Sequence, residues 1–406
     1  MNPTQLHAFL MQIGLMLTVA WLFGYLMKKL RQPIVLGELI GGVLLGPTLL
    51  GTIWPETYAT LFPVDKTITT SVDALLKVGM LFFMFAAGLE INFDRFRHGK
   101  LIIAATSLVG GALPFALGFG MVLLFPELWG HSDRPLLMAL FMGTALSISA
   151  LPVIARILMD LNLIGTRIGM TIMTSAMIND LVGWTLFAFI LRNLGVEHPA
   201  GNVFSTLALV LAYAALVLGL GRWIVLPFLH RIGFFKDWQG GLLTFLSVLV
   251  MFAAVGAEKI GIHAIFGAFL VGMAFGQYDD PKQEKRINSM IQPFALHFFA
   301  PLYFVSIGLK TNFFSHFDGT LAILVFLIAS VGKILGAGLG ARIGGMRGRE
   351  ALAVGVGLNA RGAIEIILAS VALEHQLIDQ RIFVALVMMA FATSIISAGW
   401  LKYLVR

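Results

Sequence analysis

The feature that most constrains this chain is a series of apolar stretches, each about 20 residues long, separated by short polar segments. A stretch of this length and polarity crosses the hydrocarbon core of a bilayer as a helix. Backbone groups inside lipid must be satisfied by the segment itself, so only helices or closed barrels span. Only 12% of the residues are charged, about half the share in a soluble domain. We therefore predict an all-α polytopic membrane protein.

Thirteen candidate spans can be assigned, at 7–27, 33–51, 71–90, 101–125, 135–158, 166–192, 203–228, 239–257, 261–277, 290–309, 319–342, 350–373 and 381–402. Basic residues gather in alternate loops, as in the clusters Lys28, Lys29 and Arg31; Arg95, Arg97 and Lys100; and Arg342, Arg347 and Arg349. Loops rich in Lys and Arg face the cytoplasm. This pattern predicts insertion in the cell (inner or plasma) membrane with the N-terminus outside and the C-terminus cytoplasmic.

Several function classes are disfavoured. The chain has no cysteine, which excludes disulfides and thiolate metal sites. Its net charge of +7 lies in short loops and does not form a nucleic-acid surface. No nucleophile–base pair or metal-ligand cluster stands out, so we predict neither an enzyme nor a bound cofactor.

The chain contains an internal repeat. Three glycines in the second span recur with the same spacing in the ninth: Gly37, Gly42 and Gly46, then Gly267, Gly272 and Gly276. Two further matches follow in the same order, Gly88-Leu89 with Gly308-Leu309 and Leu163-Ile164 with Leu377-Ile378. Matched spans are seven apart, an odd number, so they cross the membrane in opposite directions. We predict two inverted six-helix repeats joined by a linker helix, an arrangement typical of secondary transporters.

Asp180 is the first candidate functional residue. It is the only charge between Ile168 and Leu191, and it lies near the middle of that apolar run. Ionisable residues within spans are costly and often functional. Desolvation favours the neutral carboxyl, which makes Asp180 a candidate proton carrier. The alternative is a structural carboxylate held in a salt bridge.

Three further charges within predicted spans are candidates. Lys333 belongs to the other repeat, which brings it towards Asp180 as an ion-pair partner; alternatively it only balances charge or caps a half-helix. Arg361 and Glu365 lie four residues apart on one helical face, and a structural ion pair is favoured over a gating role. By contrast, Glu38 lies near a span end and is expected at the membrane interface.

Two spans have the composition of interrupted helices. The span at 135–158 contains Thr144, Ser147 and Ser149 followed by Pro152, and the span at 350–373 contains the run Gly355 to Gly362 with Asn359. Interrupted segments at corresponding positions of two repeats mark the binding site of many transporters, because their free carbonyls and helix ends can bind ions. Continuous helices with packing glycines are the alternative.

The chain resembles the monovalent cation:proton antiporters, nearest the cation:proton antiporter-2 family. The resemblance covers essentially the whole chain and rests on Thr144-Ala145-Leu146-Ser147, Pro152 to Leu158, Asn179-Asp180, Lys333 and Asn359 to Glu365. It implies a homodimer with an elevator mechanism. The dimerisation scaffold would be 1–98 and 203–312, and the ion-binding core 99–202 and 313–406. It also implies that Asp180 binds cation and proton alternately, with Asn179, Ser149, Thr144 and Ser147 nearby.

The resemblance also guides stoichiometry. Electrogenic members carry Asp-Asp where this chain has Asn179-Asp180, and the Asn-Asp form is usual in electroneutral relatives. We therefore expect one-for-one exchange of Na⁺ for H⁺, with K⁺ as the alternative cation. Because the chain ends at Arg406, we expect no nucleotide-binding regulatory domain such as potassium-efflux members carry. A cation channel and a symporter for organic anions are the alternatives from other classes.

Overall fold

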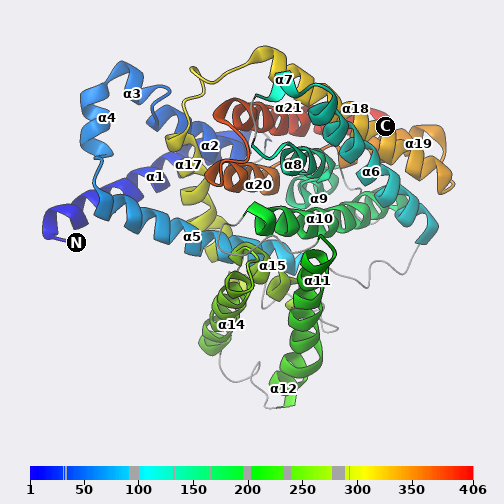
Figure 1. Cartoon of the computed structure of the whole chain (residues 1–406), viewed down its shortest axis with the longest axis horizontal. Coiled ribbons are helices and arrows are strands. Elements are labelled where there is room, and N and C mark those ends of the chain that lie inside the picture. The colour runs from blue at the N-terminus through cyan, green and yellow to red at the C-terminus, as the bar shows by residue number, and fades with distance from the viewer. Residues whose placement is uncertain are drawn as a thin grey trace. The chain divides into compact units, whose positions relative to one another are not determined.

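The computed structural model describes residues 1–30, 32, 34–90, 100–130, 133–161, 163, 166–194, 203–231, 239–276, 289–291 and 293–405. All regular structure in these residues is helical, as the sequence predicts. The helices fall into two compact units, one built from Met1–Phe93 and Glu197–Ser315 and the other from Asp94–Val196 and His316–Arg406 (Figure 1). Arg31, Arg95 and Arg97, used above for the orientation, and Ile164 of the repeat lie outside the described residues.

The first unit holds α1 (Pro3–Lys29), α2 (Ile34–Leu45), α3 (Leu50–Ile53), α4 (Pro55–Leu61), α5 (Lys66–Leu89), α11 (Val203–Gly219), η2 (Leu220–Val225), α12 (Leu226–Arg231), α14 (Gln239–Lys259), α15 (Ala264–Phe275), η3 (Ala295–Phe299) and α17 (Ala300–Lys310). Two of these segments, η2 and η3, are π-helical. The helix α5 begins earlier than the predicted span because Asp65 caps it, with Oδ1 accepting from the amides of Thr67 and Ile68.

Glycines of the sequence repeat make the closest helix contacts in this unit. A Cβ added to Gly42 of α2 would lie 2.2 Å from the carbonyl oxygen of Val305 in α17. A Cβ added to Gly272 of α15 would lie 2.1 Å from the carbonyl oxygen of Phe85 in α5. Only glycine permits such an approach of two backbones. These positions are therefore fixed by helix packing.

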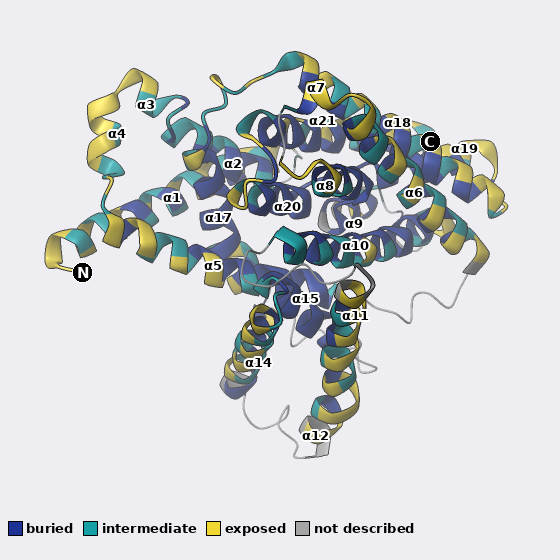
Figure 2. Cartoon of the chain, viewed as in Figure 1, coloured by how far each residue is buried: buried dark blue, intermediate teal, exposed yellow. Residues whose placement is uncertain are grey.

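The second unit holds α6 (Lys100–Leu124), α7 (Pro126–Trp129), α8 (Pro135–Ser147), α9 (Leu151–Asp160), α10 (Arg167–Leu194), α18 (Gly319–Ile343), α19 (Gly348–Leu358), α20 (Ala363–Glu374) and α21 (Gln380–Val405). Both predicted interruptions are present, one between α8 and α9 and one between α19 and α20. Figure 2 shows α8, α10 and α20 as largely buried ribbons. The interruptions thus lie inside this unit.

A row of glycines brings α18 against α6. Gly336 and Gly340 are four residues apart, and an added Cβ would lie 2.7 and 2.3 Å from the carbonyl oxygens of Val109 and Ala105. This small-xxx-small spacing is typical of close helix pairs in membranes. Lys333 lies one turn before Gly336 and is completely buried. The glycine row therefore helps to fix the helix that carries this lysine.

Ten helices in the described residues are long and apolar enough to cross a membrane, and α19 with α20, bent by 45°, gives an eleventh span. Two shorter apolar helices, α8 and α15, lie where the sequence predicts the spans at 135–158 and 261–277. The structure is thus that of an integral membrane protein with ten to eleven candidate spans. The total of thirteen, the inverted relation of the repeats and the orientation of the termini stay predictions.

Candidate ion-binding site

The two interrupted helices meet each other within the second unit. The backbone N–H of Ala150, after the end of α8, donates to the carbonyl oxygen of Ala360, after the end of α19, at 3.0 Å. The hydroxyl of Ser149 donates to the carbonyl oxygen of Leu358 at 2.8 Å. Two carbonyls at the interruption after α19 are therefore bound by the segment after α8, which satisfies backbone groups that lipid would leave unpaired.

Asp180 lies beside this meeting point. It belongs to α10 and is 1% exposed. Its Oδ1 lies 3.4 Å from the backbone nitrogen of Ser149, which donates to it. The helix comes this close because residue 183 is glycine: a Cβ there would lie 2.3 Å from the side chain of Ile148. The carboxylate and the unwound segment after α8 therefore share one buried location, as the sequence predicts.

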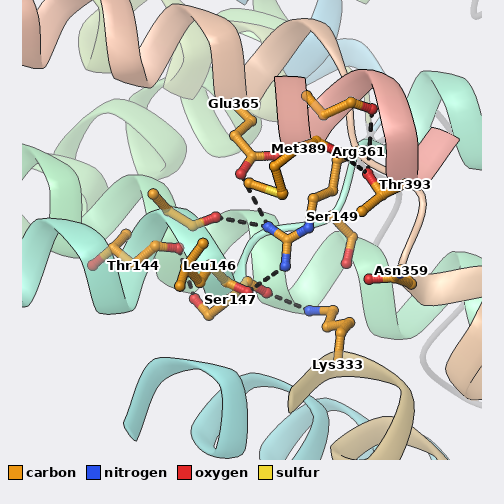
Figure 3. A network of polar contacts seen from close by, with 12 residues as sticks. Thr144, Leu146, Ser147, Ser149, Lys333, Asn359, Arg361, Glu365, Met389 and Thr393 are labelled. Atoms are coloured by element: carbon orange, nitrogen blue, oxygen red, sulfur yellow. Dashed lines mark hydrogen bonds and ion pairs between the residues drawn. The ribbon is translucent and has the colours of Figure 1, made fainter. Parts of the chain in front are cut away.

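Arg361 lies in the interruption between α19 and α20 and reaches the end of α8 (Figure 3). Its Nη1 donates to the carbonyl oxygen of Ala145 at 2.9 Å, and its Nη2 donates to that of Leu146 at 2.5 Å. Nη1 also donates to Oε1 of Glu365 at 3.1 Å, so the expected i,i+4 ion pair is present and completely buried. Carbonyls in the last turn of a helix lack intrahelical donors and carry partial negative charge. Arg361 supplies both missing donors and positive charge.

Lys333 caps the same helix end. Its ammonium donates to the carbonyl oxygen of Ser147, the last residue of α8 (Figure 3). In the amide orientation that satisfies both of its groups, Asn179 accepts from the ammonium at 3.0 Å through its oxygen and donates to the carbonyl oxygen of Ser107 at 3.0 Å. The half-helix cap, one of the alternatives left open by the sequence, is thus present in the structure.

The remaining candidates are less directly engaged. The hydroxyls of Thr144 and Ser147 donate to backbone carbonyls within α8, at 2.7 and 2.9 Å. Asn359 is buried at the end of α19, where its amide nitrogen donates to the Ser330 hydroxyl at 3.3 Å and its Oδ1 has no partner in the described part of the chain. These hydroxyl and amide oxygens keep lone pairs in a buried, polar environment.

The sequence does not single out three serines that contact the candidate residues: Ser107 on α6, Ser330 on α18 and Ser394 on α21. The hydroxyl of Ser394 donates to the carbonyl oxygen of Arg361. All three lie in apolar spans, where hydroxyl residues often bond their own helix, so their composition alone does not distinguish them. Two other hydroxyls, of Thr174 and Ser175 on α10, are buried without a partner among the described residues. Buried polar atoms of this kind are usually met by water or an ion.

A buried carboxylate beside two meeting interrupted helices, in a bundle of apolar spanning helices, defines an ion-coupled secondary transporter. Residues 15–406 match the sequence profile of the family described as "Sodium/hydrogen exchanger, transmembrane". The chain belongs to this family of cation/proton antiporters.

Relatives and a solved structure agree with this membership. The chain is 33% identical over 405 residues to Na(+)/H(+) antiporter NhaS4 of Synechocystis sp., covering 98% of this chain and 97% of that protein. It is 30% identical over 397 residues to Na(+)/H(+)-K(+) antiporter GerN of Bacillus cereus, covering 97% and 96%. Plant and yeast cation/H⁺ antiporters also match, and the chain spans about half of their length. The fold resembles that of the sodium proton antiporter MjNhaP1 from Methanocaldococcus jannaschii, with a TM-score of 0.72, 16% identity and 98% of each chain covered.

Proposed function

We propose that this protein exchanges a monovalent cation for H⁺ one for one, with Asp180 as the site over which the two ions compete. The observation that carries the proposal is the contact of Asp180 with the backbone of Ser149 in the unwound segment after α8. A carboxylate beside the carbonyl and hydroxyl oxygens of an unwound segment offers the hard oxygen ligands that a dehydrated alkali cation prefers. The same carboxylate can instead hold a proton, and it cannot hold both.

Na⁺ is the cation we propose first and K⁺ the alternative, since the related GerN is named for both ions. The second unit would act as the moving ion-binding core and the first as the dimerisation scaffold, in an elevator mechanism. The packing of the repeat glycines supports an inverted duplication. Gly42 of the first repeat packs on the helix of Gly308, and Gly272 of the second packs on the helix of Gly88, so each contact is the counterpart of the other.

Purified protein in liposomes that contain a pH-sensitive dye tests this proposal. Addition of Na⁺, Li⁺, K⁺ or Rb⁺ outside should move protons, and the order of the rates assigns the cation. Asp180→Asn should abolish exchange, because the amide neither titrates nor carries charge. Asp73→Asn, which removes an exposed carboxylate paired with Lys310, is the matched control and should leave exchange intact. Exchange retained by Asp180→Asn would overturn the site assignment.

An imposed membrane potential tests the stoichiometry. Each net charge moved is worth about 2.3 kcal/mol per 100 mV, so a second proton per cycle would shift the final ion ratio by about fifty-fold at that potential. One-for-one exchange should ignore the potential. A clear dependence would contradict electroneutrality and point to Lys333 as a second proton carrier.

A further inference from the structure

The first unit contains a cavity that the transport site does not use. It has a volume of about 340 Å³ and lies between α1, α2, η3 and the start of α17. Its lining includes Trp21, Tyr25 and Lys28 of α1, Glu38 of α2 and His297 of η3. The π-helical turn that carries His297 is itself notable, because such segments are frequent at functional sites.

Glu38 is the residue that calls for an explanation. The sequence places it near a span end, at the membrane interface, and in the structure it is 4% exposed, because α1 packs closely on α2. Gly37, its neighbour, allows that packing, since a Cβ there would lie 2.2 Å from the carbonyl oxygen of Phe23. The Oε2 atom of Glu38 has no partner among the described residues. A buried carboxylate oxygen without a donor is costly, and a ligand that supplies N–H groups removes that cost.

The rest of the cavity wall indicates what kind of ligand fits. Trp21 and Tyr25 are 71% and 61% exposed, and their rings stack with centroids 6.5 Å apart. With Leu17 and Lys28 they lie at helical spacing on one face of α1, so an apolar strip leads along the helix to an exposed ammonium. Exposed Trp and Tyr mark the level of lipid headgroups. The apolar strip of α1 can therefore contact an acyl chain, the ammonium of Lys28 can pair with a phosphate, and the carboxylate of Glu38 can accept hydrogen bonds from an amine.

We propose that this cavity binds a phospholipid whose headgroup carries a primary amine, such as phosphatidylethanolamine. The ammonium donates to the free carboxylate oxygen of Glu38, the phosphate pairs with Lys28, and an acyl chain follows Trp21 and Leu17 along α1. The opposite charges of Glu38 and Lys28 match a zwitterionic headgroup. A headgroup without an amine leaves the Glu38 oxygen unpaired.

Native mass spectrometry tests the proposal without reference to transport. The detergent-purified protein is mixed with equal amounts of phosphatidylethanolamine, phosphatidylcholine and phosphatidylglycerol of the same acyl chains. We expect phosphatidylethanolamine adducts to dominate, because choline has no N–H to donate and glycerol has no positive charge. Equal retention of all three, or preference for choline through the aromatic rings, would overturn the assignment.

Two variants with matched controls locate the site. Glu38→Gln should weaken phosphatidylethanolamine binding about ten-fold, the usual effect of losing one charge-assisted hydrogen bond, and leave phosphatidylglycerol binding unchanged. Glu56→Gln, an exposed glutamate on α4, should change neither. Lys28→Gln should weaken phospholipid adducts, and Lys29→Gln on the same helix end should not, because Lys29 does not line the cavity. Lys28 is exposed, so its variant keeps the test valid even if Glu38→Gln fails to fold. Indistinguishable effects of Lys28→Gln and Lys29→Gln would refute the site.

Discussion

Replacement of Arg361 by Met tests whether this buried guanidinium is primarily a structural cap of α8. Arg361 is completely buried and donates to the carbonyl oxygens of Ala145 and Leu146 and to the carboxylate of Glu365. Methionine fills much of the same volume but has no donor. The variant therefore leaves two helix-end carbonyls unpaired and one buried carboxylate without its cation.

The expected cost follows from these three losses. A buried carbonyl without a donor costs about 1–3 kcal/mol, and breaking a buried ion pair costs about 3–5 kcal/mol. The losses do not add fully, because a carboxylate without its partner can take up a proton. A total of about 5 kcal/mol is therefore reasonable. At about 2 °C per kcal/mol for a large domain, the apparent Tm should fall by about 10 °C.

Thermal unfolding in detergent, followed through the fluorescence of the seven tryptophans, measures this effect. Glu365→Gln alone should cost less than Arg361→Met, because the amide oxygen still accepts from Arg361 although the guanidinium loses its counter-charge. The double variant should recover about 1–3 kcal/mol relative to additivity, since no buried charge is left unpaired. Arg381→Met, which removes an exposed arginine paired with Asp379, is the control and should cost about 1 kcal/mol or less.

The result that would refute this reasoning is a Tm for Arg361→Met equal to that of the control. If that stable variant also lost transport, Arg361 would have the gating role that the sequence left open. Additive effects in the double variant would show that the two side chains do not act as a pair.

The remaining predictions concern packing, pH and the second cap. Gly42→Ala and Gly272→Ala should each destabilise the protein by about 1–3 kcal/mol, because the added Cβ would lie 2.2 and 2.1 Å from a carbonyl oxygen of the facing helix. Gly14→Ala is the control and should not lower the Tm, because no atom lies within 4 Å of a Cβ added there. Hydrogen bonds from Gln5 and from the Ile68 amide lower the pKa of Asp65. The cap therefore contributes its full stability above the ordinary carboxyl pKa of about 4, and this stability is lost as the pH falls through the lowered pKa of the folded protein. Asp65→Asn should remove this part of the Tm–pH profile, and parallel profiles would contradict it. Lys333→Met should lower the stability by about 1–3 kcal/mol, because the carbonyl oxygen of Ser147 loses its donor, and an unchanged Tm would rule out the cap.

The sequence predicts the helical architecture and the position of Asp180 because both depend on local composition. Hydropathy alone identifies each span, and a single carboxylate within an apolar stretch can be recognised from the sequence without any structure. The same holds for the pair Arg361 and Glu365, since helical spacing brings residues four apart together. The ends of α8 at Ser147 and of α19 at Leu358 are likewise indicated in the sequence, by clustered serines in the first case and clustered glycines in the second.

What the sequence leaves open are contacts between distant segments. The bonds from Arg361 to Ala145 and Leu146 join residues 216 and 215 positions apart, and no periodicity within one span specifies them. Lys333 could be placed near Asp180 by the repeat, but not on the last carbonyl of α8. The position of Glu38 near a span end follows from the sequence, but its burial by α1 does not.

The charges gathered in the second unit bear on the proposed competition of the two ions for Asp180. Asp180, Glu365, Arg361 and Lys333 are all buried, and their formal charges cancel when all four are ionised. Binding of a monovalent cation at Asp180 raises the total by one, and protonation of Asp180 raises it by the same amount. Both loaded forms then have equal charge, so moving either across the membrane does the same electrical work, and a complete cycle of proposed one-for-one exchange does none. Arg361 and Lys333 also cap the negative end of α8. The partial negative charge of this helix end reduces the repulsion between these two side chains and an incoming ion. A potential-dependent cycle would therefore require a second member of this group to change its charge, and Lys333, whose ammonium donates to the side-chain oxygen of Asn179, is the candidate.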